Sequence, residues 1–96
     1  MKEGSVMTEI LAIDDDRGIL EVIRRALSRE GYHVTTLDDP QKLDESQLPR
    51  YQLILLDVMM PGMDGFQLCR KIRDRVDCPI LFLTAKTDEK DLMEGL

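Results

Sequence analysis

The feature that most constrains this chain is an unbroken apolar run at residues 53–56, LILL, that ends on a single carboxylate, Asp57. Comparable short runs, apolar or β-branched, stand at residues 9–13, 33–37 and 79–84. Their composition is typical of strands. Runs that are apolar throughout indicate strands buried on both faces, as in a parallel sheet, whereas the half-polar run at 33–37 indicates an edge strand.

Segments with helical spacing separate these runs. Residues 17–30 place apolar side chains close to the spacing of a helix face, and Gly31 follows where the glycine after a helix belongs. A short helix opened by Pro40 is expected across residues 40–47. The alternation of strands and helices predicts an α/β fold, in which a doubly wound parallel sheet has right-handed crossovers and helices on both faces.

Two more helices are expected in the second half of the chain. Asp64 can cap a helix over residues 65–75. Three side chains are expected on the inward face of this helix: Phe66, Cys69 and Ile72. Another helix is expected from Asp88 onward.

The run at residues 80–83 is apolar at every position, which predicts an interior strand. A fifth strand is therefore expected beyond it, and the 96-residue sequence supplies none. The expected organisation is a loose tail at residues 1–7 and one domain at residues 8–96 that is incomplete at its C-terminus.

The charge balance limits the classes of partner. Thirteen Lys and Arg against nineteen Asp and Glu give a net charge of −6. Such a surface repels phosphate backbones and anionic lipids, so direct contact with nucleic acid or a membrane is not expected. No apolar run approaches the roughly 20 residues that span a bilayer. The opening MKEGSVMTE has no hydrophobic stretch, so it is not a secretory signal, and a cytoplasmic location is expected.

Acidic and hydroxyl residues follow the predicted strands. Asp14, Asp15 and Asp16 follow the first strand, Asp57 ends the third, and Thr84 ends the fourth. Carboxyl ends of parallel strands share one edge of the sheet, where ligands bind. Neighbouring carboxylates repel unless a proton or a cation lies between them, and a few oxygen ligands with retained waters suit Mg²⁺. Asp57 is then a carboxylate on a rigid strand end that can attack phosphorus.

Three blocks in this order resemble the receiver domain of bacterial two-component response regulators: IDDD at 13–16, LLDVMMPGMDGF at 55–66 and LTAK at 83–86. The resemblance covers residues 9–96, and LTAK followed by acids and MEGL is most similar to the OmpR/PhoB type. It implies the flavodoxin-like strand order 2-1-3-4-5, here without the fifth strand and last helix. It also implies a phosphoacceptor that assists its own phosphorylation and is not a turnover enzyme.

The resemblance implies a role for each matching residue. Asp57 matches the phosphoacceptor, and Thr84 the switch hydroxyl that turns toward the phosphoryl oxygens. Ala85 matches the small residue that leaves room for that group. The implied Mg²⁺ site contains Asp57 and three further ligands: Asp15 directly, Asp14 through water, and the backbone carbonyl of Met59. Asp16 is not assigned to the site. The implied partners are a sensor histidine kinase and a DNA-binding output domain of the winged-helix type.

The sequence departs from the family where the fifth strand would be. The lysine-proline pair that follows that strand in the family has no counterpart, because Lys86 directly follows the threonine block. The chain is therefore interpreted as the front part of a longer regulator. Phosphorylation of this fragment is expected to be weak, because it lacks the lysine. A fragment ending at Leu96 is expected to form a homodimer through the exposed edge of its fourth strand, exchange its last segment, or be unstable.

Two other classes of function stay open. Asp14-x-Asp16 resembles the nucleophile motif of haloacid-dehalogenase-type phosphatases, although Gly18 stands where that motif has threonine or valine. Turnover of a generic phosphomonoester would support this reading. The other alternative is an interaction module independent of phosphorylation, which failure to accept a phosphoryl group from a small donor would favour. The one histidine, His33, begins the edge strand, which excludes a His-based triad.

Overall fold

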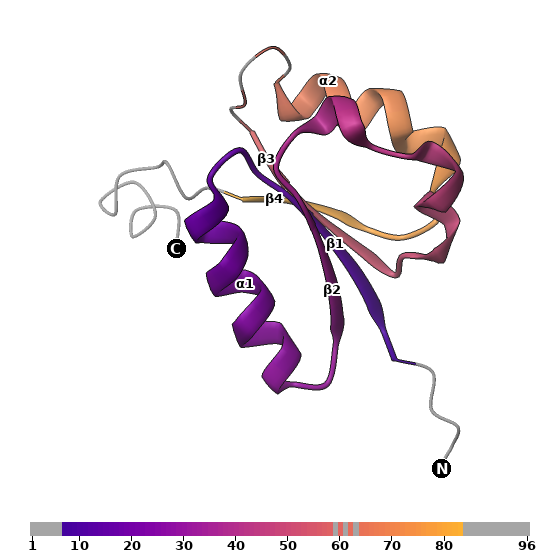
Figure 1. The fold of residues 1–96 in the computed structure, drawn as a ribbon. Helices are drawn as coiled ribbons and strands as arrows, with labels where there is room; N and C mark the ends of the chain where they lie inside the picture. The colour runs from indigo at the N-terminus through magenta and orange to yellow at the C-terminus, as the bar shows by residue number, and fades with distance from the viewer. Residues whose placement is uncertain (1–6, 59, 61, 63, 84–96) are drawn as a thin grey trace, which may run out of the picture.

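The computed structural model describes residues 7–58, 60, 62 and 64–83 (Figure 1). Its four strands are β1 (Glu9–Ile13), β2 (His33–Leu37), β3 (Leu53–Asp57) and β4 (Ile80–Leu83). All neighbouring strands are parallel, and their order in the sheet is β2-β1-β3-β4. The predicted α/β class, the order 2-1-3-4 and the edge position of β2 are confirmed. The helix expected from Asp88 lies outside the described residues.

The sheet separates two apolar layers, because alternate residues of each strand point to opposite faces. Ile10 and Ala12 of β1 pack with Leu20 of helix α1 (Arg17–Arg29), which covers one face (Figure 1). Leu11 and Ile13 pack on the other face. That second layer also contains side chains from β3, from helix α2 (Gly65–Ile72) and from the segment between β2 and β3.

Helix α1 lies where the helical spacing of residues 17–30 predicts it. Asp16 is the N-cap, and its Oδ1 accepts hydrogen bonds from the backbone N–H groups of Gly18 at 2.9 Å and Ile19 at 3.2 Å. Glu30 is the C-cap residue. Gly31 follows with φ of 92°, a left-handed conformation that costs glycine little because it has no Cβ.

The segment between β2 and β3 forms two 3₁₀ helices, η1 (Pro40–Lys42) and η2 (Glu45–Arg50), where one short helix was predicted. Asp39 caps the first and Asp44 caps the second, so each carboxylate starts its own turn. Pro49 inside η2 lacks the N–H that a longer helix would use. Leu48 of η2 is fully buried and anchors the segment to the sheet.

The inward face of α2 differs from the prediction. Leu68 and Ile72 are buried, whereas Phe66 is 50% exposed and packs on Phe82 with a ring-centroid distance of 4.8 Å. The reason is the packing of Gly65, which is buried against the end of β3. Positions three and seven residues after Gly65 share its face of the helix, and Phe66 does not. The predicted helix continues over 73–75 as the 3₁₀ helix η3 (Arg73–Arg75).

Strand β4 pairs with β3 through the whole of its length, and in the described part of the chain it has no second neighbour. Leu81 is 53% exposed. The expected fifth strand, the homodimer and the division into a tail and a domain stay predictions. Among the described helices, none combines the length and apolar character that a membrane span requires.

Gly65 offers a test of the packing at the end of β3. A Cβ at this position would overlap the backbone oxygen of Asp57 and lie 2.9 Å from Cα of Val58. We expect Gly65→Ala to lower the free energy of unfolding by about 1–3 kcal/mol, because backbone atoms must shift to admit the methyl group. Urea unfolding measures the effect. Gln67→Ala, an exposed change in the same helix, is the control, and an equal effect of both variants would contradict this packing.

Candidate acidic site

Two neighbouring strands deliver carboxylates to the same point. The register pairs Ile13 of β1 with Leu56 of β3, so the next residues, Asp14 and Asp57, lie level with each other at the carboxyl edge of the sheet. Asp57 is the last residue of β3, and Asp14 directly follows β1. Because strand pairing fixes both backbones, neither carboxylate depends on a flexible loop for its position.

Both carboxylates are withdrawn from water. Asp14 is 0% exposed and Asp57 is 2% exposed. The backbone N–H of Asp14 donates to the carbonyl oxygen of Leu37 at 3.1 Å, which ties this residue to β2 as well. Its Oδ1 accepts a hydrogen bond from the backbone N–H of Asp16 at 2.9 Å. Its Oδ2 is buried and receives no hydrogen bond from the described residues, an arrangement that favours a proton or a cation at this oxygen.

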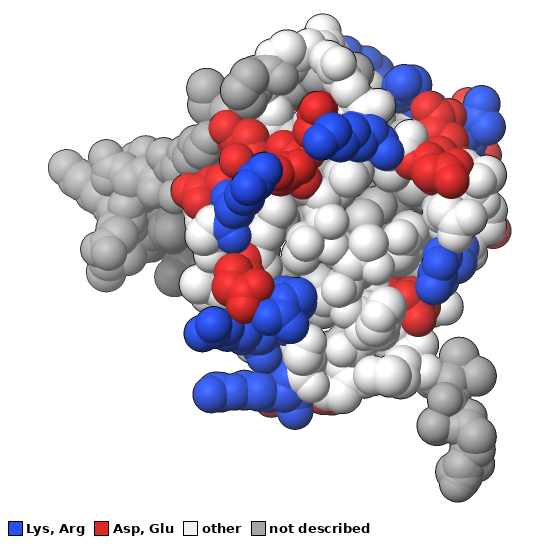
Figure 2. All heavy atoms as spheres, in the orientation of Figure 1, with Lys and Arg blue, Asp and Glu red and all other residues white. Residues whose placement is uncertain are grey.

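Asp15 completes a cluster of three acids. One carboxylate oxygen from each of Asp14, Asp15 and Asp57 lies within 4.8 Å of the others, and Asp15 is the most exposed of the three. Figure 2 shows acidic side chains gathered over this end of the molecule, above the loop that joins β1 to α1, with basic side chains among them. The carboxylates predicted to converge therefore do so.

The cluster changes the acidity of Asp14. Burial, which penalises the charged form, raises the pKa of this carboxyl group from 3.8 to about 6, and the negative charges of Asp57 and Asp15 act in the same direction. The hydrogen bond from the backbone N–H of Asp16 acts against them and lowers the pKa. Asp14 therefore holds a proton more readily than an ordinary aspartate does.

A backbone hydrogen bond joins the end of β3 to the start of α2. The backbone N–H of Gly65 donates to the carbonyl oxygen of Val58 at 2.7 Å. Gly62 has φ of 80°, a left-handed conformation that glycine adopts readily in turns. Asp64 is the predicted helix cap, since its Oδ1 accepts a hydrogen bond from the backbone N–H of Gln67 at 2.8 Å. Met60 is buried, as expected of a side chain that fills the core.

Three predicted site residues lie outside the described residues: Met59, Thr84 and Ala85. Their proposed roles stay predictions. His33, which was expected to have no role in catalysis, lies at the amino end of β2. Its Nδ1 contacts Oε1 of Glu9 at 2.8 Å, at the opposite end of the strands from the acidic cluster.

Two features near the site were not found from the sequence. Asp16 caps α1, a role that its position directly before a helical segment could have indicated. The second feature is an ion pair between Arg17 and Asp38, with 2.7 Å between Nε and Oδ2. The hydrogen bond from Arg17 lowers the pKa of Asp38. No local pattern indicates a pair of residues 21 positions apart on different elements.

The residues present fit a magnesium ion. The cluster offers only carboxylate oxygens, the ligand type that Mg²⁺ prefers. Asp14 Oδ2 is a buried oxygen with no donor in the part of the chain that the structure describes, and Asp15 is accessible enough for the waters that Mg²⁺ retains. Asp14, Asp15 and Asp57 are therefore the described residues that would hold the ion.

Fold and site together define a class, namely a doubly wound parallel α/β domain with an acidic cluster at the carboxyl ends of β1 and β3. The family model described as the response regulator receiver domain matches residues 10–96. The chain belongs to this family of receiver domains from two-component response regulators. The resemblance noted in the sequence is thereby confirmed.

Similar proteins agree with this membership. The transcriptional regulatory protein SpaR of Bacillus subtilis is 51% identical over 90 residues, which are 94% of this chain and 41% of SpaR. The response regulator ArlR of Staphylococcus aureus is 40% identical over 91 residues, or 94% of this chain and 42% of ArlR. The chain thus spans about two-fifths of these relatives. The structure of the chemotaxis protein CheY4 of Vibrio cholerae is 34% identical, with a TM-score of 0.76, and the match covers 94% of this chain and 78% of CheY4.

The raised pKa of Asp14 predicts how the stability of the metal-free protein depends on pH. Between pH 3.8 and about 6 the folded state retains a proton that the unfolded chain releases, so this group's contribution to stability falls as pH rises. Asp14→Asn removes the titration and keeps an oxygen for the N–H of Asp16. Relative to wild type, its free energy of unfolding should rise between about pH 4 and pH 7, by at most about 3 kcal/mol and less where water screens the charges.

Urea unfolding in the presence of EDTA measures this difference. Wild type and variant are compared at each pH, so the titration of other groups largely cancels. A difference that stays constant across the range would contradict the raised pKa.

Asp15→Asn separates metal binding from folding. It removes one ligand and one negative charge from the cluster, so we expect weaker Mg²⁺ binding and unchanged or higher stability without metal. Melting temperatures with EDTA and with increasing Mg²⁺ measure both effects. Asp77→Asn, an exposed change in the segment before β4, is the matched control. Normal Mg²⁺ binding by a destabilised Asp15→Asn would place the metal elsewhere.

Proposed function

We propose that this domain is the phosphoacceptor receiver of a two-component response regulator, with Asp57 as the residue that takes the phosphoryl group from a phosphohistidine of a sensor histidine kinase. The observation that carries the proposal is the position of Asp57. Its carboxylate ends the central strand β3, is 2% exposed, and lies in a cluster with Asp14 and Asp15. A nucleophile held on a strand end is oriented before its substrate arrives.

The proposed transfer forms one bond and breaks another. A carboxylate oxygen of Asp57 forms a bond to phosphorus, the bond from phosphorus to the histidine nitrogen breaks, and that nitrogen keeps the electron pair. The products are an aspartyl phosphate and the dephosphorylated histidine. Such transfers pass through a loose transition state, so the residues contribute mainly alignment and charge. Strand β3 aligns Asp57.

Asp14 and Asp15 hold the cation in this proposal, together with Asp57 and the carbonyl of Met59. Bound Mg²⁺ would supply positive charge opposite the carboxylates and the phosphoryl oxygens. Burial of Asp14 raises its pKa, and the negative charges of Asp57 and Asp15 add to this effect when no cation is bound. Thr84 is proposed as the hydroxyl that responds to phosphorylation, and Ala85 as the small residue that leaves space for the phosphoryl group. These three roles, of Met59, Thr84 and Ala85, rest on the match to the receiver family.

The rest of the proposal concerns the whole protein. SpaR is named a transcriptional regulatory protein, and this chain matches two-fifths of it. We infer a receiver unit at residues 8–96 of a cytoplasmic regulator of the OmpR/PhoB type. Its output would be a DNA-binding domain of the winged-helix type. The net charge of −6 supports contact with DNA through that output domain and not through the receiver.

Beryllofluoride, a phosphoryl mimic, tests the assignment of Asp57. In the presence of Mg²⁺ it should bind the wild type and raise its melting temperature. It should leave Asp57→Asn unchanged, because the amide is a far weaker ligand for beryllium than the carboxylate. Asp77→Asn is the control for loss of one charge at an exposed position away from the site. Equal shifts in the Asp57→Asn and wild-type proteins would refute the assignment.

A further inference from the structure

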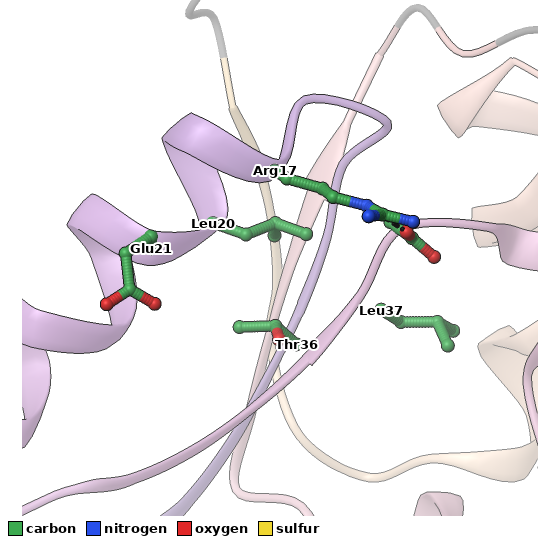
Figure 3. Close-up of a pocket in the computed structure, with 6 residues that line it drawn as sticks. Arg17, Leu20, Glu21, Thr36 and Leu37 are labelled. Atoms are coloured by element: carbon green, nitrogen blue, oxygen red, sulfur yellow. Dashed lines mark hydrogen bonds and ion pairs between the residues drawn. The ribbon is translucent and has the colours of Figure 1, made fainter.

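Arg17 reaches across the end of the sheet beside the acidic site. It is the first residue of α1, and Figure 3 shows its side chain extending away from the helix toward the segment that follows β2. There its Nε donates to Oδ2 of Asp38 at 2.7 Å. Within the described part of the chain, the guanidinium makes no other hydrogen bond. Its two terminal nitrogens therefore remain available to an anion.

The ion pair is easily exchanged. The side chain of Arg17 is 85% exposed, and that of Asp38 is 28% exposed. Pairs this accessible contribute little to stability, because water screens both charges. A phosphate group offers the guanidinium two hydrogen bonds in the planar arrangement that arginine favours. Arg17 can therefore leave Asp38 for an incoming phosphate without a large loss of stability.

The pair also separates two cavities. One has a volume of about 340 Å³ and lies between α1 and β2 (Figure 3). The other has a volume of about 400 Å³ and contains Asp15 in its wall, which places it next to the acidic cluster. Cavities of roughly 300–1,000 Å³ commonly bind small molecules. The second cavity is lined by two basic residues, Arg17 and Lys42, and by three acids, Asp15, Asp38 and Asp39.

An anionic phosphodonor meets an electrostatic obstacle at this site. Its target, Asp57, is clustered with two more carboxylates, and the chain carries a net charge of −6. A cation beside the route of approach raises the local concentration of an anion and the rate at which it arrives. Among the described residues, Arg17 is the arginine placed beside both Asp15 and an open cavity of suitable size.

We propose that Arg17 binds the phosphoryl oxygens of small acyl phosphates in the cavity beside Asp15 and presents them to Asp57. The inference rests on the proposed function. Asp38 holds the guanidinium in place until a donor arrives, and the donor then replaces Asp38 as its partner. In the following step a carboxylate oxygen of Asp57 forms a bond to phosphorus. The bond between phosphorus and the acyl oxygen breaks, and the carboxylate leaves with the electron pair.

Acetyl phosphate is the probe for this proposal. At low ionic strength and with saturating Mg²⁺, the second-order rate constant for phosphorylation should fall about 5–10-fold in Arg17→Ala. Arg17→Lys should recover most of the rate, because it keeps the charge. The difference between wild type and Arg17→Ala should shrink as salt rises from about 0.02 M to 0.5 M, because salt screens the attraction. A merely structural role of Arg17 would produce neither the recovery nor the salt dependence.

Two further variants complete the experiment. Asp38→Asn weakens the competing ion pair and should raise the rate constant about twofold. Arg25→Ala removes an exposed arginine of α1 that pairs with Glu21, and it should leave the rate unchanged. A rate for Arg17→Ala within twofold of wild type at low salt would overturn the proposal, as would an Arg17→Lys variant as slow as Arg17→Ala. If Arg17→Ala proves unstable, a rate for Asp38→Asn at or below that of wild type overturns it.

Failure of this inference can be told from failure of the proposed function. The proposed function itself would be contradicted if the wild-type protein accepted no phosphoryl group. It would also be contradicted if the Asp57→Asn variant were phosphorylated as well as wild type. Wild type that is labelled at Asp57 while Arg17→Ala reacts equally fast would contradict only the role of Arg17.

Discussion

The pairing of β1 with β3 is the constraint on which the rest of this structure depends. Because Ile13 and Leu56 are partners, two carboxylates must lie side by side where the strands end. Both are buried, so their repulsion is poorly screened by water. Apolar packing on both faces of the sheet holds this unfavourable arrangement in place. Burial first, and the neighbouring negative charges second, raise the pKa of Asp14.

A site built in this way favours any occupant that places positive charge between its carboxylates. A proton at Asp14 is one such occupant, and Mg²⁺ is the one that suits the function proposed for this domain. The surrounding elements limit the alternatives. Asp16 and Asp64 cap α1 and α2, and Gly65 lies so close to the backbone of Asp57 that no larger residue fits without a shift. Charge and shape therefore select the ligand together.

Much of the fold could be predicted from the sequence, because its strands are short apolar runs and its helix ends have typical caps. The strand order came from the resemblance to the receiver family. The inward face of α2 could not be predicted well, since Phe66 is apolar and fits the helical spacing. The close packing of Gly65 decided the orientation instead, and it leaves Phe66 half exposed on Phe82. The two short turns at residues 40–50 also depart from the single helix expected there.

In the candidate site, too, some features could be predicted from the sequence and others could not. The sequence by itself determined which residues are acids, that each follows a strand, and that parallel strands bring their ends to one edge. Only the tertiary structure decided that Asp14 and Asp57 are level and buried, that Asp15 is the more exposed ligand, and that Arg17 pairs with Asp38. The physical reason is that strand ends follow from local composition. Register, burial and ion pairs between distant residues depend on how the whole sheet is packed.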